Sequence, residues 1–113
     1  MDITLDRVKV VYDLGALNTI PRGEGRIFQV GATRVAVFRT RDDEVFATQA
    51  DCPHRNGPLA DGIVGAGKVI CPLHAAAFDL ATGAPLNQIC SAAIKTYPIS
   101  VDFNGHMIMT LAE

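Results

Sequence analysis

Two short segments of the sequence each pair a cysteine with a histidine, and these residues are the best equipped for chemistry. The first segment is Cys52-Pro53-His54, and the second is Cys71-Pro72-Leu73-His74. Thiolate and imidazole are side chains that bind soft and borderline transition metals. Cys52, His54, Cys71 and His74 therefore predict a metal centre held between two loops.

The division of these ligands between the loops bears on the kind of metal centre. Two thiolates and two imidazoles could hold one zinc ion, but structural zinc sites usually place two Cys in one loop and two His in another. One Cys and one His in each loop suit a binuclear [2Fe–2S] cluster, because each loop then gives its Cys to one iron and its His to the other. A zinc-bound structural or interaction module remains an alternative of a different class.

Residues near the four ligands also fit a cluster. Pro53 and Pro72 stiffen the loops. Gly57 lets the backbone come close to inorganic sulfide. Cys90 and His106 lie outside both loops, so we expect Cys90 to be a buried free thiol and His106 to have a surface or structural role.

The rest of the chain must position these loops, and its pattern is typical of an all-β protein. Short β-rich runs alternate with turn signals. Asn104-Gly105 between two such runs is a strong hairpin signal, and Gly31-Ala32-Thr33 indicates a second hairpin. The expected strands span residues 8–12, 26–30, 34–39, 45–49, 63–64, 68–70, 95–101 and 106–111.

The central region 51–86 differs from its surroundings, because it holds four of the six prolines and both ligand pairs. Functional loops are commonly carried by a rigid scaffold. We therefore predict a single domain over residues 1–113. Its expected architecture is an antiparallel β-sandwich or barrel with an inserted cluster-binding part, residues 51–86, made of two loops.

Composition narrows the function classes. Hydrophobic residues make up 49% of the 113 residues and charged residues 19%, which suits one folded core. The net charge of -2 without a basic stripe argues against nucleic acid as a partner. No apolar run approaches the ~20 residues of a membrane helix, and Met1–Asp6 lacks the basic start of a signal peptide. The three cysteines, an odd number, do not make a disulfide framework. We expect a cytoplasmic protein.

The sequence around the ligands resembles a known family. The run DCPHRNGPLADG at 51–62 and the run CPLH at 71–74 are similar to the Rieske motif C-x-H…C-x-x-H. The resemblance covers nearly the whole chain. It implies the Rieske fold, with a [2Fe–2S] cluster bound at the tip by Cys52, His54, Cys71 and His74. It also implies exposed histidines and a function in one-electron transfer.

Within this family the sequence resembles two kinds of electron-transfer protein. The runs GPLADGIV at 57–64 and KTYPI at 95–99 look most like the small subunit of NAD(P)H-dependent assimilatory nitrite reductases, whose partner is the large subunit. The runs FATQ at 46–49 and CSAAIK at 90–95 suit a Rieske ferredoxin, which passes electrons from a flavin reductase to an aromatic-ring dioxygenase. We place the nitrite reductase small subunit slightly ahead of the Rieske ferredoxin. Both are electron-transfer components of an oxidoreductase, without a substrate site of their own.

Departures from the family pattern indicate a low potential. Relatives commonly show Gly-Trp-x-Phe-Asp after the second His, whereas this chain has AAAFD at 75–79, which changes the rim of the cluster. High-potential relatives in respiratory complexes have a disulfide between the loops and Ser and Tyr hydroxyls near sulfur. The matching positions here are Gly57 with Leu73, Ala76 and Phe78. Fewer donors to sulfur stabilise the added electron less, so we expect a potential near the −150 mV end of the family's range.

Overall fold

The computed structural model describes residues 9–112. This part of the chain forms three antiparallel sheets and two short 3₁₀ helices, so the predicted all-β class is confirmed. Two predictions fall on residues outside this range. The absence of a signal peptide was predicted from Met1–Asp6, and the first strand was predicted to begin at Val8. Neither of the described helices is long and apolar enough to cross a membrane.

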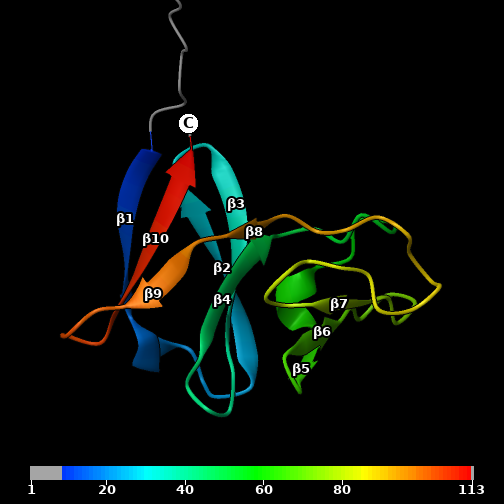
Figure 1. Ribbon diagram of the computed structural model, residues 1–113, viewed down its shortest axis with the longest axis horizontal. Helices are drawn as coiled ribbons and strands as arrows, with labels where there is room; N and C mark the ends of the chain where they lie inside the picture. The colour runs from blue at the N-terminus through cyan, green and yellow to red at the C-terminus, as the bar shows by residue number, and fades with distance from the viewer. Residues whose placement is uncertain (1–8, 113) are drawn as a thin grey trace, which may run out of the picture.

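Two of the sheets form a base, and the third lies beside it in the region predicted to bind a cluster, which we call the cluster-binding part (Figure 1). One base sheet has the order β1 (Lys9–Ala16), β10 (His106–Ala112), β9 (Ile99–Val101). The other has the order β2 (Glu24–Val30), β3 (Thr33–Arg39), β4 (Val45–Gln49), β8 (Thr96–Tyr97). The cluster-binding part consists of β5 (Ile63–Gly65), β6 (Lys68–Ile70) and β7 (Ala77–Asp79). The 3₁₀ helices are η1 (Leu17–Thr19) and η2 (Leu59–Asp61).

Strand β3 separates the two hydrophobic cores of the molecule. Successive side chains of a strand point to opposite faces, and four successive residues of β3 are fully buried. Val35 and Val37 pack in the base core with Ile20, Met107 and Met109. The side chains on the opposite face belong to the core of the cluster-binding part, and these are Ala36 and Phe38. One strand therefore fixes the cluster-binding part against the base.

Both predicted hairpins are present, but their turns differ from each other. Val30 pairs with Thr33, which leaves a two-residue loop in which Gly31 alone has a positive φ, of 60°. This pattern is that of a type II′ turn. At the second hairpin Gly105 has φ 78°, whereas Asn104 is not left-handed. The Asp102 N–H donates to the His106 carbonyl, so the loop has three residues and ends in glycine.

The run predicted as one strand at 95–101 is divided in the structure. Thr96–Tyr97 pairs with β4 in one base sheet, whereas Ile99–Val101 pairs with β10 in the other. Pro98 lies between them and has no N–H to donate, but its carbonyl accepts from Thr110 N–H at 3.0 Å. The proline thus marks the point at which the chain passes from one sheet to the next.

The cluster-binding part contains more structure than the sequence indicated. Strands β5 and β6 are close to the predicted positions, but β7 was not predicted. It forms because Val69 pairs with Phe78 and Ile70 with Ala77. The packed region also extends past residue 86, because Cys90 and Ile94 belong to the same core.

His106 forms an ion pair far along the chain from either ligand loop. Its Nδ1 lies 2.9 Å from one carboxylate oxygen of Asp13 and 3.0 Å from the other. This hydrogen bond raises the pKa of His106 above its usual 6.5 and lowers the pKa of Asp13. The expected surface role for His106 agrees with this contact.

We predict that NMR titration will give His106 a pKa above 6.5, and that Asp13→Asn will return it towards that value. Because the folded pKa is raised, protonated His106 stabilises the fold below the unfolded pKa. This contribution is lost as the pH rises through the folded pKa, and it is small because both side chains are exposed. An unchanged His106 titration in Asp13→Asn would contradict the assignment.

Candidate metal centre

The two ligand loops share two backbone features, a closing hydrogen bond and a pair of left-handed residues. In the first, Cys52 N–H donates to the carbonyl of Gly57 at 2.8 Å, and in the second Cys71 N–H donates to the carbonyl of Ala76 at 2.7 Å. Each bond spans five residues. The third and fourth residues after each Cys have positive φ, and these are Arg55 (64°), Asn56 (58°), His74 (65°) and Ala75 (61°). The sequence thus forms one loop geometry twice.

The cysteines lie at the buried base of these loops. Cys52 and Cys71 are 0% and 1% exposed, and both pack in the core that contains Phe38 and Phe78. The Cys71 thiol and the backbone N–H of His54 both lie close enough to the Cys52 thiol to affect its ionisation. Burial, with the neighbouring Cys71 thiol, raises the pKa of Cys52 to about 11. Metal ligands must be thiolates, so assembly of a metal centre here releases protons.

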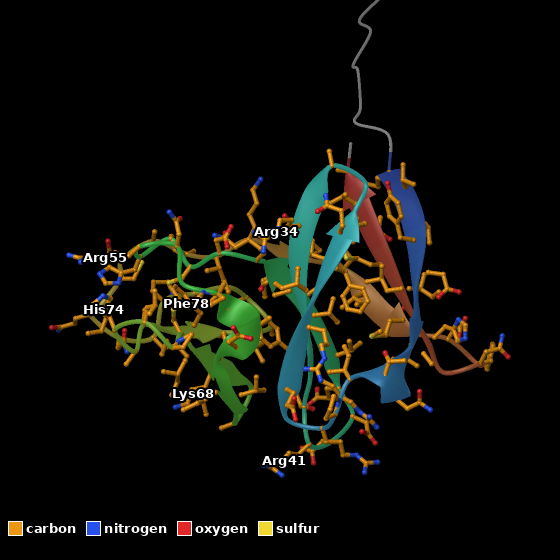
Figure 2. All side chains as sticks on the ribbon, turned by 180° about the vertical axis from the view of Figure 1, so that it is seen from behind. Arg34, Arg41, Arg55, Lys68, His74 and Phe78 are labelled. Atoms are coloured by element: carbon orange, nitrogen blue, oxygen red, sulfur yellow. The ribbon has the colours of Figure 1, made fainter. Side chains whose placement is uncertain are left out.

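The histidines lie at the outer end of the same loops. The rings of His54 and His74 are 5.2 Å apart between centroids and nearly perpendicular, at 86°. Figure 2 shows His74 and Arg55 at the end of the molecule farthest from the base. The structure therefore gathers all four predicted ligands at one end, with thiols inside and imidazoles outside.

One atom of the site has no partner. Among the described residues, Nδ1 of His54 is the one buried side-chain nitrogen or oxygen without a hydrogen bond. Buried polar atoms are rarely left unpaired, and an imidazole nitrogen without a partner, two residues from a free cysteine, is a ready iron ligand. In residues 9–112 no three or more His, Cys, Asp or Glu side chains converge on a single ion.

Gly57 lets the two loops approach each other. A Cβ at this position would lie 2.5 Å from Cys71 Sγ and 3.2 Å from Leu73 Cβ. Gly57 therefore faces Leu73 across the loops, at the positions where high-potential relatives were expected to carry a disulfide. Ala76 and Phe78 are fully buried beside them. The four residues from which a low potential was predicted therefore all lie in this core or at its edge.

The second ligand loop and the segment 84–94, which Asn87 bonds to this loop, carry exposed apolar side chains, and we call these two segments the rim of the site. Leu73, Leu86 and Ile89 are 43%, 48% and 45% exposed. Arg55 is the one charged residue among 52–58, 71–78 and 84–94. Such an exposed apolar patch around a site is typical of contact with another protein.

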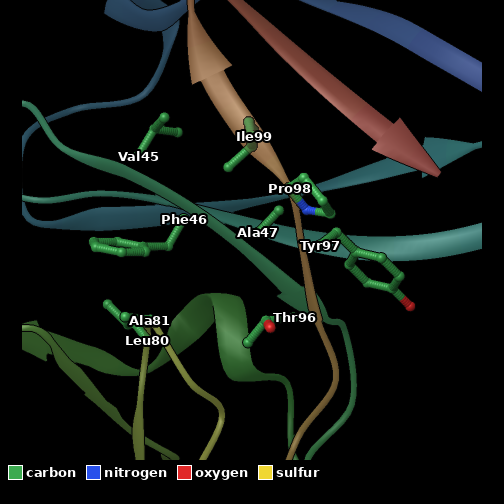
Figure 3. A pocket seen from close by; sticks show the side chains of 9 residues that line it. All are labelled: Val45, Phe46, Ala47, Leu80, Ala81, Thr96, Tyr97, Pro98 and Ile99. Carbon is green, nitrogen blue, oxygen red and sulfur yellow. The ribbon is translucent and has the colours of Figure 1, made fainter.

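Two further features lie apart from the ligands. Cys90 is buried as expected, with its thiol 3.6 Å from the carbonyl of Ala92. A groove of about 400 Å³ between β4, β8, β9 and the end of the cluster-binding part is lined by nine residues and contains none of the four ligands (Figure 3). Phe46, Leu80 and Tyr97 are among its walls. We assign no chemistry to this groove.

The sequence analysis missed one residue that contacts the second loop. Asn87 donates its side-chain N–H to the carbonyl of Ala75 at 2.9 Å. No local signal marks Asn87, because it lies outside the motif and its partner is twelve residues away.

Comparison with known proteins identifies the family. The profile of the Rieske [2Fe-2S] domain matches residues 10–98. The chain belongs to the Rieske [2Fe-2S] family and is an electron-transfer domain. It is 36% identical to the anthranilate 1,2-dioxygenase ferredoxin subunit of Burkholderia cepacia over 80% of this chain and 82% of that protein. It is 31% identical to the ferredoxin component of naphthalene 1,2-dioxygenase/salicylate 5-hydroxylase systems of Ralstonia sp, over 80% and 86%.

Solved structures agree with this fold. A structure described as an NADH-dependent nitrite reductase small subunit from Mycobacterium tuberculosis superposes with a TM-score of 0.85 at 24% identity, covering 94% of this chain and 98% of that one. The ferredoxin of carbazole 1,9a-dioxygenase from Nocardioides aromaticivorans gives 0.81 at 28%, covering 88% and 96%. A structure described as a nitrite reductase NADPH small subunit gives 0.78 at 28%, covering 91% and 99%.

We predict that Gly57→Ala will strongly reduce cluster incorporation, because its Cβ would lie 2.5 Å from Cys71 Sγ. Iron content per chain and visible absorption measure the effect. The matched control is Gly65→Ala, since a Cβ at Gly65 meets nothing within 4 Å and its φ is not positive. Equal iron content in the two variants would show that the close approach of the loops is not required.

Proposed function

We propose that Cys52, His54, Cys71 and His74 are the ligands of the Rieske [2Fe–2S] cluster, with the cysteines on the inner iron and the histidines on the outer iron. The observation that carries this assignment is the buried Nδ1 of His54, which has no hydrogen-bond partner. His54 belongs to the same loop as the buried Cys52. The centroid of its ring is 5.2 Å from that of the His74 ring. When bound, the cluster supplies one-electron redox chemistry.

The residues of the chain have separable tasks in this function. The two Cys hold the buried side of the centre in the core shared with Phe38. The two His present their imidazoles at the surface, where an electron enters and leaves. Leu73, Leu86 and Ile89 exclude water once a partner covers the rim. Neutral imidazole in place of thiolate makes the centre less negative than a four-Cys cluster.

We propose that the chain is the ferredoxin of an aromatic-ring dioxygenase system, receiving electrons from a flavin reductase and passing them to the oxygenase. Support comes from two relatives, at 31% and 36% identity, which are ferredoxin components of dioxygenase systems. This order reverses the slight preference from the sequence. The nitrite reductase small subunit is the second candidate, favoured by the 28% identical structure of that description.

Two further parts of the proposal concern the redox potential of the cluster and the cellular location of the protein. The absence of hydroxyls at Ala76 and Phe78, and of a cysteine pair at Gly57 and Leu73, supports a potential low in the Rieske range. Three free cysteines, among residues 9–112, suit the reducing cytoplasm. The zinc-bound module loses its support, because the family profile is that of a [2Fe-2S] domain.

We predict that Ala at any one of Cys52, His54, Cys71 or His74 will prevent stable cluster assembly, because an iron with an open position is readily lost. Iron content and the visible spectrum report assembly. Cys90→Ser is the matched control: this cysteine is buried in the same core but outside the loops, so iron and spectrum are expected to remain. A full-strength spectrum in Cys71→Ala would refute the ligand assignment.

The electron-transfer partner is the test of the proposed system. We predict that the holoprotein, immobilised and exposed to lysate of its native cell, will retain an oxygenase and a flavin reductase, identified by mass spectrometry. The purified reductase should then reduce the holoprotein with NADH or NADPH, followed by loss of visible absorption. Retention and turnover with a nitrite reductase large subunit instead would overturn the ferredoxin proposal and establish the second candidate.

A further inference from the structure

The second ligand loop holds an alanine, Ala75, in the left-handed region of the backbone. Both loops place two successive residues in the left-handed region, which is unfavourable for most L-residues. In the first loop one of these residues is Asn56, a type that tolerates this region. In the second loop the corresponding residue is Ala75, with φ 61°. Alanine has no side-chain group to compensate, so the loop of His74 needs support from elsewhere.

The second loop also has fewer backbone hydrogen bonds of its own. In the first loop Asn56 N–H donates to the carbonyl of Cys52 at 2.9 Å, in addition to the bond between Cys52 and Gly57. The equivalent bond from Ala75 to Cys71 is not present among the backbone bonds of the described residues. The strained position in the second loop is therefore also the less supported one.

Asn87 supplies a bond from outside the loop. Its Nδ2 donates to the carbonyl of Ala75 at 2.9 Å, while its Oδ1 accepts from Ile89 N–H at 3.3 Å and, more weakly, from Ala77 N–H at 3.4 Å. Leu86 N–H donates to the carbonyl of Ala77 at 2.8 Å and fixes this segment to β7. The Asn87 amide is thus held on one side by its own segment and on the other holds the residue after His74.

We propose that Asn87 is a positioning residue for the metal centre, which keeps the loop of His74 in its left-handed conformation. The proposal rests on the assignment of His74 as a ligand. The positioning role belongs to Nδ2 of Asn87, which donates to the carbonyl of Ala75. The bond that Oδ1 accepts from Ile89 N–H would also be present if Asn87 only stabilised the turn of its own segment.

The experiment compares Asn87→Ala and Asn87→Asp with the wild-type holoprotein. The Asp variant keeps an oxygen that can accept from Ile89 but cannot donate to Ala75. We expect both variants to release the cluster to an iron chelator roughly two- to tenfold faster, which corresponds to the loss of one hydrogen bond. Their reduced forms should give broadened electron paramagnetic resonance lines, because His74 is less fixed. Asn104→Ala, in the exposed β9–β10 turn, is the control and should behave as wild type.

A rescue separates positioning from general destabilisation. Glycine adopts positive φ without a steric cost, so Ala75→Gly in the Asn87→Ala background should restore slow release and narrow lines. Wild-type release and spectra in Asn87→Ala, release as slow in Asn87→Asp as in wild type, or no rescue by Ala75→Gly would each overturn the proposal. A cluster fully retained in His74→Ala would instead remove the ligand assignment, which keeps the two failures distinct.

Discussion

The packing of β3 on both of its faces is the constraint on which the rest of the molecule depends. Val35 and Val37 fix the strand in the base, while Ala36 and Phe38 extend into the core that contains Cys52 and Cys71. Space around Phe38 is tight, since a Cβ at its cross-strand partner Gly25 would lie 2.8 Å from the Phe38 ring. Interiors packed at this density are stiff, so the cysteines keep a defined position relative to the whole fold.

The site runs from the buried cysteines to the outer histidines at the surface, where electrons can be exchanged. The same loop geometry occurs twice, yet His54 follows its Cys by two residues and His74 by three. His74 therefore falls on a left-handed residue, whereas His54 does not. The two rings reach the same end of the molecule from different steps of similar loops. The unequal spacing of C-x-H and C-x-x-H thus places the two imidazoles at different positions of their loops.

The sequence was most informative where local pattern decides the structure. Residues 45–49 were predicted as a strand and form β4 with the same bounds, and the four ligands predicted from type and spacing come from two loops at one end of the molecule. Features set by distant contacts were not predictable. Strand β7 exists through its pairing with β6, the break at Pro98 depends on which sheet accepts each half, and Asn87 matters only because folding brings it to Ala75. The turn at Asn104-Gly105 was located correctly, but its length follows from the pairing of β9 with β10.

The two ligand loops differ in which residues hold them in place. The first loop is closed by its own residues, with Asn56 and Gly57 suited to their conformations and contacts. The second has alanine at the strained position, and its support comes from the segment that also carries the exposed Leu86 and Ile89. Asn87 lies between these two apolar residues and bonds to both the loop and Ile89 N–H. Asn87 therefore joins the segment that carries Leu86 and Ile89 to the residue next to His74 through one side-chain amide. Both ligand cysteines pack in the same core against β3, so the two loops differ in how their outer ends are held and not in where their buried ends are fixed.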